Sequence, residues 1–129
     1  DLQWKRAAAP FRDLVRALLV RRTTPQGHGF ADLETARIAA RCAAIVAAEM
    51  GWPNDRFVPE DPAATLFWAH EDGLDATAAV MAIEAEWGIH IDDTEFLAWI
   101  RGDWGRFVAN VTGRVRESTQ RPIIDQARK

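Results

Sequence analysis

Apolar residues recur every three or four positions over much of the chain, which is the spacing of one face of an α-helix. The first such series follows Pro10, and proline is favoured in the first turn of a helix. We therefore expect a helix that begins near Pro10. Its apolar face comprises Phe11, Leu14, Val15, Leu18 and Leu19.

A second, longer helix is predicted from about Asp32 to Met50. Its apolar stripe contains Ile38, Cys42 and Ile45. Gly51 fits the left-handed position that commonly ends a helix, and the Trp-Pro-Asn sequence after it prevents continuation. The turn-forming residues between 23 and 29 place a loop before this helix.

Two further helices are predicted beyond an extended crossing segment around Phe57. Asp61 and Pro62 suit the N-cap and the first turn of a short helix. This short helix carries Leu66, Phe67 and Trp68. The next helix begins between 72 and 75 and ends at Gly88, and its buried stripe contains Ala76, Val80, Ile83 and Trp87.

The last two helices follow a connector around His90. Asp92, Asp93 or Thr94 can cap a short helix, whose apolar residues are Phe96, Leu97 and Ile100. Asp103 can cap the final helix, and the positions on its apolar face are Trp104, Phe107, Val108, Val111 and Val115. After Arg116 the residues are mostly polar, so we expect the helix to end there.

No segment shows the alternating pattern of a β-strand, so the pattern predicts an all-α fold, a small helical bundle with an extra N-terminal amphipathic helix. We divide the chain into a basic amphipathic helix and loop (1–30), the bundle (31–116) and a polar tail (117–129). The length of 129 residues fits one domain. No stretch approaches the roughly 20 apolar residues of a membrane span.

Composition adds two expectations about the setting of the protein. The lone cysteine, Cys42, cannot form an internal disulfide, so we expect a reducing compartment, the cytoplasm. It lies on the apolar stripe of its helix, which favours a buried residue over a nucleophile. Because the chain begins with Asp1 and not with Met, we expect it to be a piece of a longer protein.

Charge is distributed unevenly along the chain, although the net charge is only −3. Residues 1–50 hold five acids and eight bases, residues 51–100 hold eleven acids and the single base Arg56, and residues 101–129 hold three acids and seven bases. An acidic middle repels nucleic acid and attracts basic protein surfaces. Alternatively, the basic ends fold back onto the acidic middle.

The acidic middle contains Asp72-Gly73-Leu74-Asp75 and then the run from Val80 to Asp93. With these residues the chain resembles the acyl carrier protein family. Carrier proteins show Asp-Ser-Leu, then an apolar-periodic helix that ends in Glu-Glu-Phe-Gly-Ile-x-Ile and an acidic cap. The resemblance covers roughly residues 33–112 and implies a small helical bundle.

One departure from the family changes the expected function. In carrier proteins, the serine of Asp-Ser-Leu holds phosphopantetheine through a phosphodiester. Gly73 falls on that position, and glycine has no oxygen with which to form the ester, so we expect no cofactor. Thr77 lies one helical turn after Gly73, but the family's attachment geometry does not support Thr77 as a substitute for the serine.

The resemblance also suggests how such a domain would meet a partner. The family's partner-binding glutamate falls on Ala78, whereas four other acids remain, namely Asp72, Asp75, Glu84 and Glu86. They imply an acidic face that docks a basic surface, for example on an enzyme of acyl or peptidyl chain assembly.

The sequence offers few candidates for catalysis or metal binding. His70-Glu71-Asp72 is more simply the polar end of one helix and the cap of the next, because adjacent helical positions do not face each other. The acids after His90, which are Asp92, Asp93 and Glu95, lack a metal-ligand spacing, and acids at a helix start are favoured by its dipole. We therefore predict neither an enzyme nor a metal site.

The tryptophans and the N-terminal helix bear on interfaces. Trp87, Trp99 and Trp104 fit apolar helix faces, whereas Trp4 and Trp52 are candidate interface residues. The N-terminal helix mixes leucines with arginines, for example Arg16 and Arg21. We expect its apolar face to pack on the domain, the alternatives being the same helix of a second copy or an anionic membrane.

The favoured function is thus a non-catalytic, carrier-like interaction module without a phosphopantetheine arm. Two alternatives remain open. One is a genuine carrier that is modified at an unusual site, and the other is a helical nucleic-acid-binding domain that uses the basic ends of the chain, which the acidic middle opposes.

Overall fold

The computed structural model describes the backbone of residues 2–25, 27–67 and 75–128, and the side chains of residues 12–25, 27–67 and 76–119. Over the described residues the chain is all-α, as predicted, with six helices and no strand. The helices are α1 (Leu2–Arg21), α2 (Leu33–Met50), α3 (Ala63–Phe67), α4 (Asp75–Trp87), α5 (Asp93–Trp99) and α6 (Trp104–Arg128).

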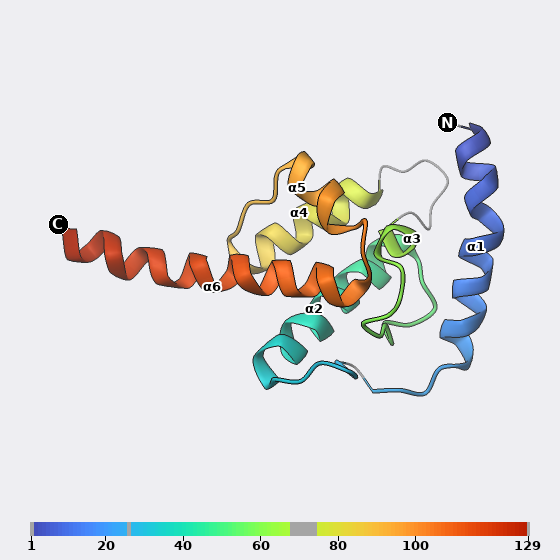
Figure 1. Cartoon of the computed structure of the whole chain (residues 1–129), viewed down its shortest axis with the longest axis horizontal. Helices are drawn as coiled ribbons and strands as arrows, with labels where there is room; N and C mark the ends of the chain where they lie inside the picture. The colour runs from blue at the N-terminus through green and yellow to red at the C-terminus, as the bar shows by residue number, and fades with distance from the viewer. Residues whose placement is uncertain (1, 26, 68–74, 129) are drawn as a thin grey trace.

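Helix α2 lies at the centre of the bundle. It packs against α4, α6 and α3, while α1 contacts α3 at the outer side of the molecule (Figure 1). α5 packs on the first half of α6. The second half of α6 extends beyond the other helices, as the red end of the ribbon in Figure 1 shows.

Both ends of α2 are fixed by the residues that the sequence marked as caps. The Asp32 carboxylate accepts a hydrogen bond of 2.8 Å from the Thr35 backbone N–H, and this bond lowers the pKa of Asp32. At the other end, Gly51 adopts the left-handed conformation with a φ of 75° and donates to the Ala47 carbonyl. A side chain at that φ would be strained, which is why glycine ends the helix.

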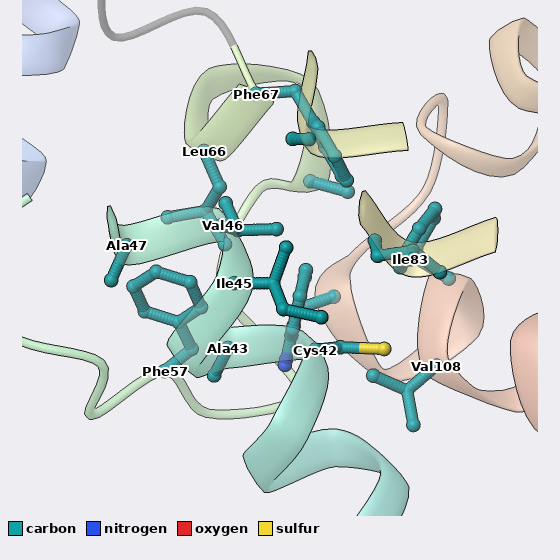
Figure 2. Packing of buried hydrophobic residues seen from close by; sticks show 14 of the residues in the cluster. Cys42, Ala43, Ile45, Val46, Ala47, Phe57, Leu66, Phe67, Ile83 and Val108 are labelled. Atoms are coloured by element: carbon teal, nitrogen blue, oxygen red, sulfur yellow. The ribbon is translucent and has the colours of Figure 1, made fainter. Parts of the chain in front are cut away.

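The apolar core forms between α2, α4 and α6. Figure 2 shows Cys42, Ile45 and Val46 of α2 beside Ile83 of α4 and Val108 of α6. Each of these side chains is buried. Burial removes the Cys42 thiol from water and so raises its pKa, which keeps the thiol protonated and unreactive. The prediction that Cys42 is a core residue is confirmed.

The crossing segment, residues 52–62, connects α2 to α3. An aromatic cluster joins this segment to α3 and α6. Trp104 meets Phe57 edge to face at a centroid distance of 5.2 Å and stacks on Phe107 at 5.4 Å. Phe67 meets Phe107 at 4.9 Å. Offset and edge-to-face pairs at these distances add to the stabilisation from area burial alone.

Backbone hydrogen bonds tie the crossing segment to the start of α6. The Trp104 N–H donates to the Asp61 carbonyl at 2.7 Å, and the Gly105 N–H donates to the Pro59 carbonyl at 2.9 Å. A side chain at Gly105 would place its Cβ 2.9 Å from the Pro59 Cβ. Glycine at this position therefore allows the two backbones to approach closely.

Several predicted element ends agree with the structure. Gly88, with a φ of 63°, follows the last residue of α4. Asp92 caps α5, and the Asp103 carboxylate accepts from the Arg106 N–H at 2.9 Å at the start of α6. The predicted stripe of α4 faces the core, since Ala76 and Ile83 are buried and Val80 and Trp87 pack against the core cluster.

Two predicted helix ends are wrong. α1 begins at Leu2 and not near Pro10, because the alanines before the proline are strong helix formers. α6 continues to Arg128 and does not stop at Arg116. The polarity of its second half reflects a helix that leaves the bundle, since such a helix needs no apolar face.

Two residue roles also differ from the prediction. Asp61 does not cap α3, because its carboxylate accepts from the Val58 N–H at 2.9 Å and pairs with Arg22 at 2.7 Å. Trp52 is not a surface residue, since it is buried and its Nε1–H donates to the Leu66 carbonyl at 2.9 Å. Trp104 is buried in the core as predicted, and Trp4 and Trp68 lie outside the described side chains.

Candidate functional site

A groove of about 410 Å³ lies between α4 and α5. The residues that line it come from both helices and from the connector between them. They are Ala76, Thr77, Val80, Met81, Glu84, His90, Ile91, Asp92, Asp93 and Phe96. We call this site the α4–α5 groove.

The groove combines an apolar lining with an acidic rim. Met81 is 61 % exposed on α4, while Ile91 is buried and Phe96 packs against the core. Asp92 and Asp93 are exposed at the start of α5. An exposed methionine beside carboxylates suits a partner that presents both apolar and basic side chains, because the thioether adapts its shape and the acids select charge.

Glu84 builds the wall of the groove. Gly88 turns the chain back after α4, which brings the connector over the last turn of the helix. There the Glu84 carboxylate accepts a hydrogen bond of 2.8 Å from the Ile91 N–H and lies 3.1 Å from His90 Nδ1. Glu84 therefore holds the connector in place, and its charge is only partly available to a partner.

Two sets of side-chain contacts hold the first turn of α5 in place. Asp92 and Glu95 form a capping box, in which each side chain accepts from the other residue's backbone N–H. Glu95 also pairs with Arg114 of α6, which in addition donates to the His90 carbonyl. The hydrogen bond from Arg114 is the main cause that lowers the pKa of Glu95 and raises that of Arg114.

This pairing predicts a pH-dependent contribution to stability. A carboxyl group whose pKa is lower in the folded state stabilises the fold above its unfolded pKa, about 4.3 for glutamate, and the contribution is lost as the pH falls through the folded value. We expect Glu95→Gln to be less stable than the wild type at pH 7, and the difference to shrink below about pH 4.3. Urea unfolding between pH 7 and pH 3 measures it, and a pH-independent difference would contradict it.

The predicted acidic face is only partly brought together. Glu84 lies in the groove, but Glu86 pairs with Arg41 of α2 at 3.0 Å. Asp72 and Gly73 lie outside the described residues, as does the side chain of Asp75, the first residue of α4. The local sequence pattern of α4 does not predict these pairings, because Arg41, the partner of Glu86, lies on α2 and His90, the partner of Glu84, lies in the connector after α4.

Asp92 and Asp93 also line the groove, together with Met81, whereas the sequence predicts them only as capping residues. Their place there depends on how α5 folds back on α4. Thr77 also lines the groove, on the same face of α4 as Met81, and its side chain is exposed. Ala78 is exposed on α4 and does not line the groove.

The other chemical candidates are the acids after His90 and the His70-Glu71-Asp72 sequence. Among the residues that the structure describes, no group of three or more histidine, cysteine, aspartate or glutamate side chains could hold a metal ion. Asp92 and Glu95 are engaged in the capping box. His70 and Glu71 lie outside the described residues.

No family model matches the chain, and neither the curated proteins nor the solved structures include a significant match. The resemblance to acyl carrier proteins stays a prediction that rests on the residues quoted above. In the described part of the chain, no helix has the length and apolar character needed to cross a membrane.

Proposed function

We propose that this chain is a non-catalytic interaction module that docks a basic protein surface through the α4–α5 groove. The observation that carries the proposal is that the exposed Met81 lines the same groove of about 410 Å³ as Asp92 and Asp93. Such a groove offers apolar contact area together with negative charge, which are the two features that a basic helix or loop needs for docking.

The resemblance supports the absence of a cargo arm and suggests the class of partner. Gly73 stands where carrier proteins have the attachment serine, so the proposed module binds proteins without carrying phosphopantetheine. An enzyme of acyl or peptidyl chain assembly is the partner that the resemblance implies. Association through an acidic rim weakens as salt is added, because exposed charges are screened over about 8 Å at physiological ionic strength.

The test must leave the groove intact while it removes the docking chemistry. Reversing the charge of Glu84 is unsuitable, because the change also removes the acceptor of the Ile91 N–H. We instead choose the double variant Met81→Glu/Asp93→Lys, in which both altered side chains are exposed. Glu49→Lys, on the exposed side of α2, is the matched control for the charge reversal.

Affinity capture from the native cell's lysate at low salt, read by mass spectrometry, measures the effect. We expect the wild type and the Glu49→Lys control to retain the same assembly enzymes, and the double variant to lose them. Retention should also fall as salt is raised. Equal retention by the double variant, or a retained set free of such enzymes, would overturn the proposal.

A further inference from the structure

Among the described side chains, most of the exposed large apolar ones lie on α1 or on α4 and α5, which differ in charge. One set lies on α1, where Leu14 is 57 % and Leu18 is 50 % exposed. The other set consists of Met81, which lines the α4–α5 groove, and Leu97, which is exposed on α5. Exposed apolar side chains that cluster beside charged groups are typical of interaction surfaces.

The leucines of α1 lie on a helix whose neighbouring side is already packed. Val15 and Leu19 are buried against the domain, as predicted, whereas Leu14 and Leu18 are not covered, in contrast to the prediction. Leu14 and Leu18 stand four positions apart and therefore on one face. We call Leu14 and Leu18 the α1 leucine face.

Polar contacts hold α1 in place and so present the α1 leucine face in a fixed orientation. Arg22, directly after the helix, pairs with Asp61 at 2.7 Å and donates to the Arg56 carbonyl at 2.8 Å. Asn54 donates to the Leu19 carbonyl at 2.7 Å. A face that is ordered before binding loses less conformational entropy when a partner covers it.

Charge decides which surface suits the α1 leucine face. α1 contains five basic residues and one acid, Asp13; the basic residues are Lys5, Arg6, Arg12, Arg16 and Arg21. Two copies of α1 side by side would place like charges together, and so would two acidic grooves. Pairing α1 of one copy with the groove of another brings opposite charges together.

The spacing of the side chains on the two surfaces also agrees. Leu14 and Leu18 are one turn apart, which is about 6 Å along the helix. Thr77 and Met81 have the same separation along the groove wall on α4. Amphipathic helices dock into apolar grooves through anchors at this i, i+4 spacing.

We propose that the α4–α5 groove also binds the α1 leucine face of a second copy of this chain. The inference rests on the proposed function in that it uses the same groove as a docking site for a basic surface. The contact joins two different patches, so each copy carries one donor face and one acceptor groove.

Mixing two single variants tests this directly. Leu18→Glu removes the α1 leucine face but keeps the groove, and Met81→Glu removes the groove lining but keeps the α1 leucine face. Analytical ultracentrifugation should show the wild type self-associating, and each variant alone should associate at least about tenfold more weakly, a loss of about 1.4 kcal/mol. Their equimolar mixture should regain a one-to-one complex, because one intact face meets one intact groove.

The control is Leu33→Glu, which alters a side chain that is 66 % exposed on α2 and belongs to neither patch. It should associate like the wild type. All variants change exposed residues, and circular dichroism checks that each keeps its helices. Rising salt should dissociate the wild type, since opposite charges meet at the contact.

Three results would overturn the inference. The first is a wild type that stays monomeric at about 100 µM, which is far above a micromolar dissociation constant. The second is a Met81→Glu variant that still self-associates through α1. The third is a mixture of the two variants that stays monomeric. None of them removes the proposed function, whose test is the capture of assembly enzymes. Failure of that capture with successful mixing would leave the groove as a self-association site.

Discussion

Replacing Trp104 with alanine should lower the free energy of unfolding by about 3–5 kcal/mol. The side chain is almost fully buried and contacts Phe57, Phe67 and Phe107, so its removal leaves a cavity among three rings that cannot all move inward. At about 4 °C per kcal/mol for a domain of this size, the melting temperature should fall by about 12–20 °C. Thermal and urea unfolding followed by circular dichroism measure both quantities.

A matched control uses an apolar residue that has no such surroundings. Leu97 is exposed on α5, so Leu97→Ala should change the free energy of unfolding by less than about 0.5 kcal/mol. If Trp104→Ala cost no more than this control, the aromatic cluster would not be the stabilising centre that its geometry indicates.

The second large effect is expected at the mostly buried ion pair that joins the end of α1 to the crossing segment. Asp61→Ala should destabilise the fold by about 3 kcal/mol, because it leaves the Arg22 guanidinium, whose side chain is only 17 % exposed, without its counter-charge. The substitution also removes the acceptor of the Val58 N–H. Urea unfolding of the wild type, both single variants and the Arg22→Ala/Asp61→Ala double variant gives the coupling energy of the pair.

An exposed ion pair between two helices provides the comparison. Arg116 of α6 pairs with Glu34 of α2 at 3.1 Å, and both side chains are more than half exposed. Arg116→Ala should therefore cost no more than about 1 kcal/mol. Equal losses for Asp61→Ala and Arg116→Ala would mean that burial does not strengthen the Arg22–Asp61 pair.

The helix order could be predicted from the sequence because its signals are local. Asp32 and Gly51 bound α2 through contacts with residues three or four positions away, and the same holds for Asp92 at the start of α5. The apolar stripe of α4 was predicted for the same reason. Such caps and periodic faces need no knowledge of the tertiary structure.

The contacts that the sequence did not predict are those whose partners lie far along the chain. Asp61 resembles an N-cap in its local sequence, but Arg22 engages it from 39 positions away. Trp52 follows a helix-ending glycine and yet packs inward to meet Leu66. Glu86 resembles a free surface acid until α2 brings Arg41 against it.

The groove could not be predicted from sequence patterns. The acids of its rim were predicted as caps, and the apolar residues of its lining as members of helix faces. Their arrangement around one hollow depends on the angle between α4 and α5, which is set by the connector bonds of Glu84 and by the contact of Arg114 with Glu95. A local pattern contains no information about that angle.

The bonds between the crossing segment and α6 have a consequence for amide hydrogen exchange. The first N–H groups of a helix normally lack partners within it and exchange early with solvent. In α6 the N–H groups of Trp104 and Gly105 bond to carbonyls more than 40 positions earlier in the chain. These amides can exchange only when the crossing segment detaches from α6, so they report that detachment and not the fraying of one helix.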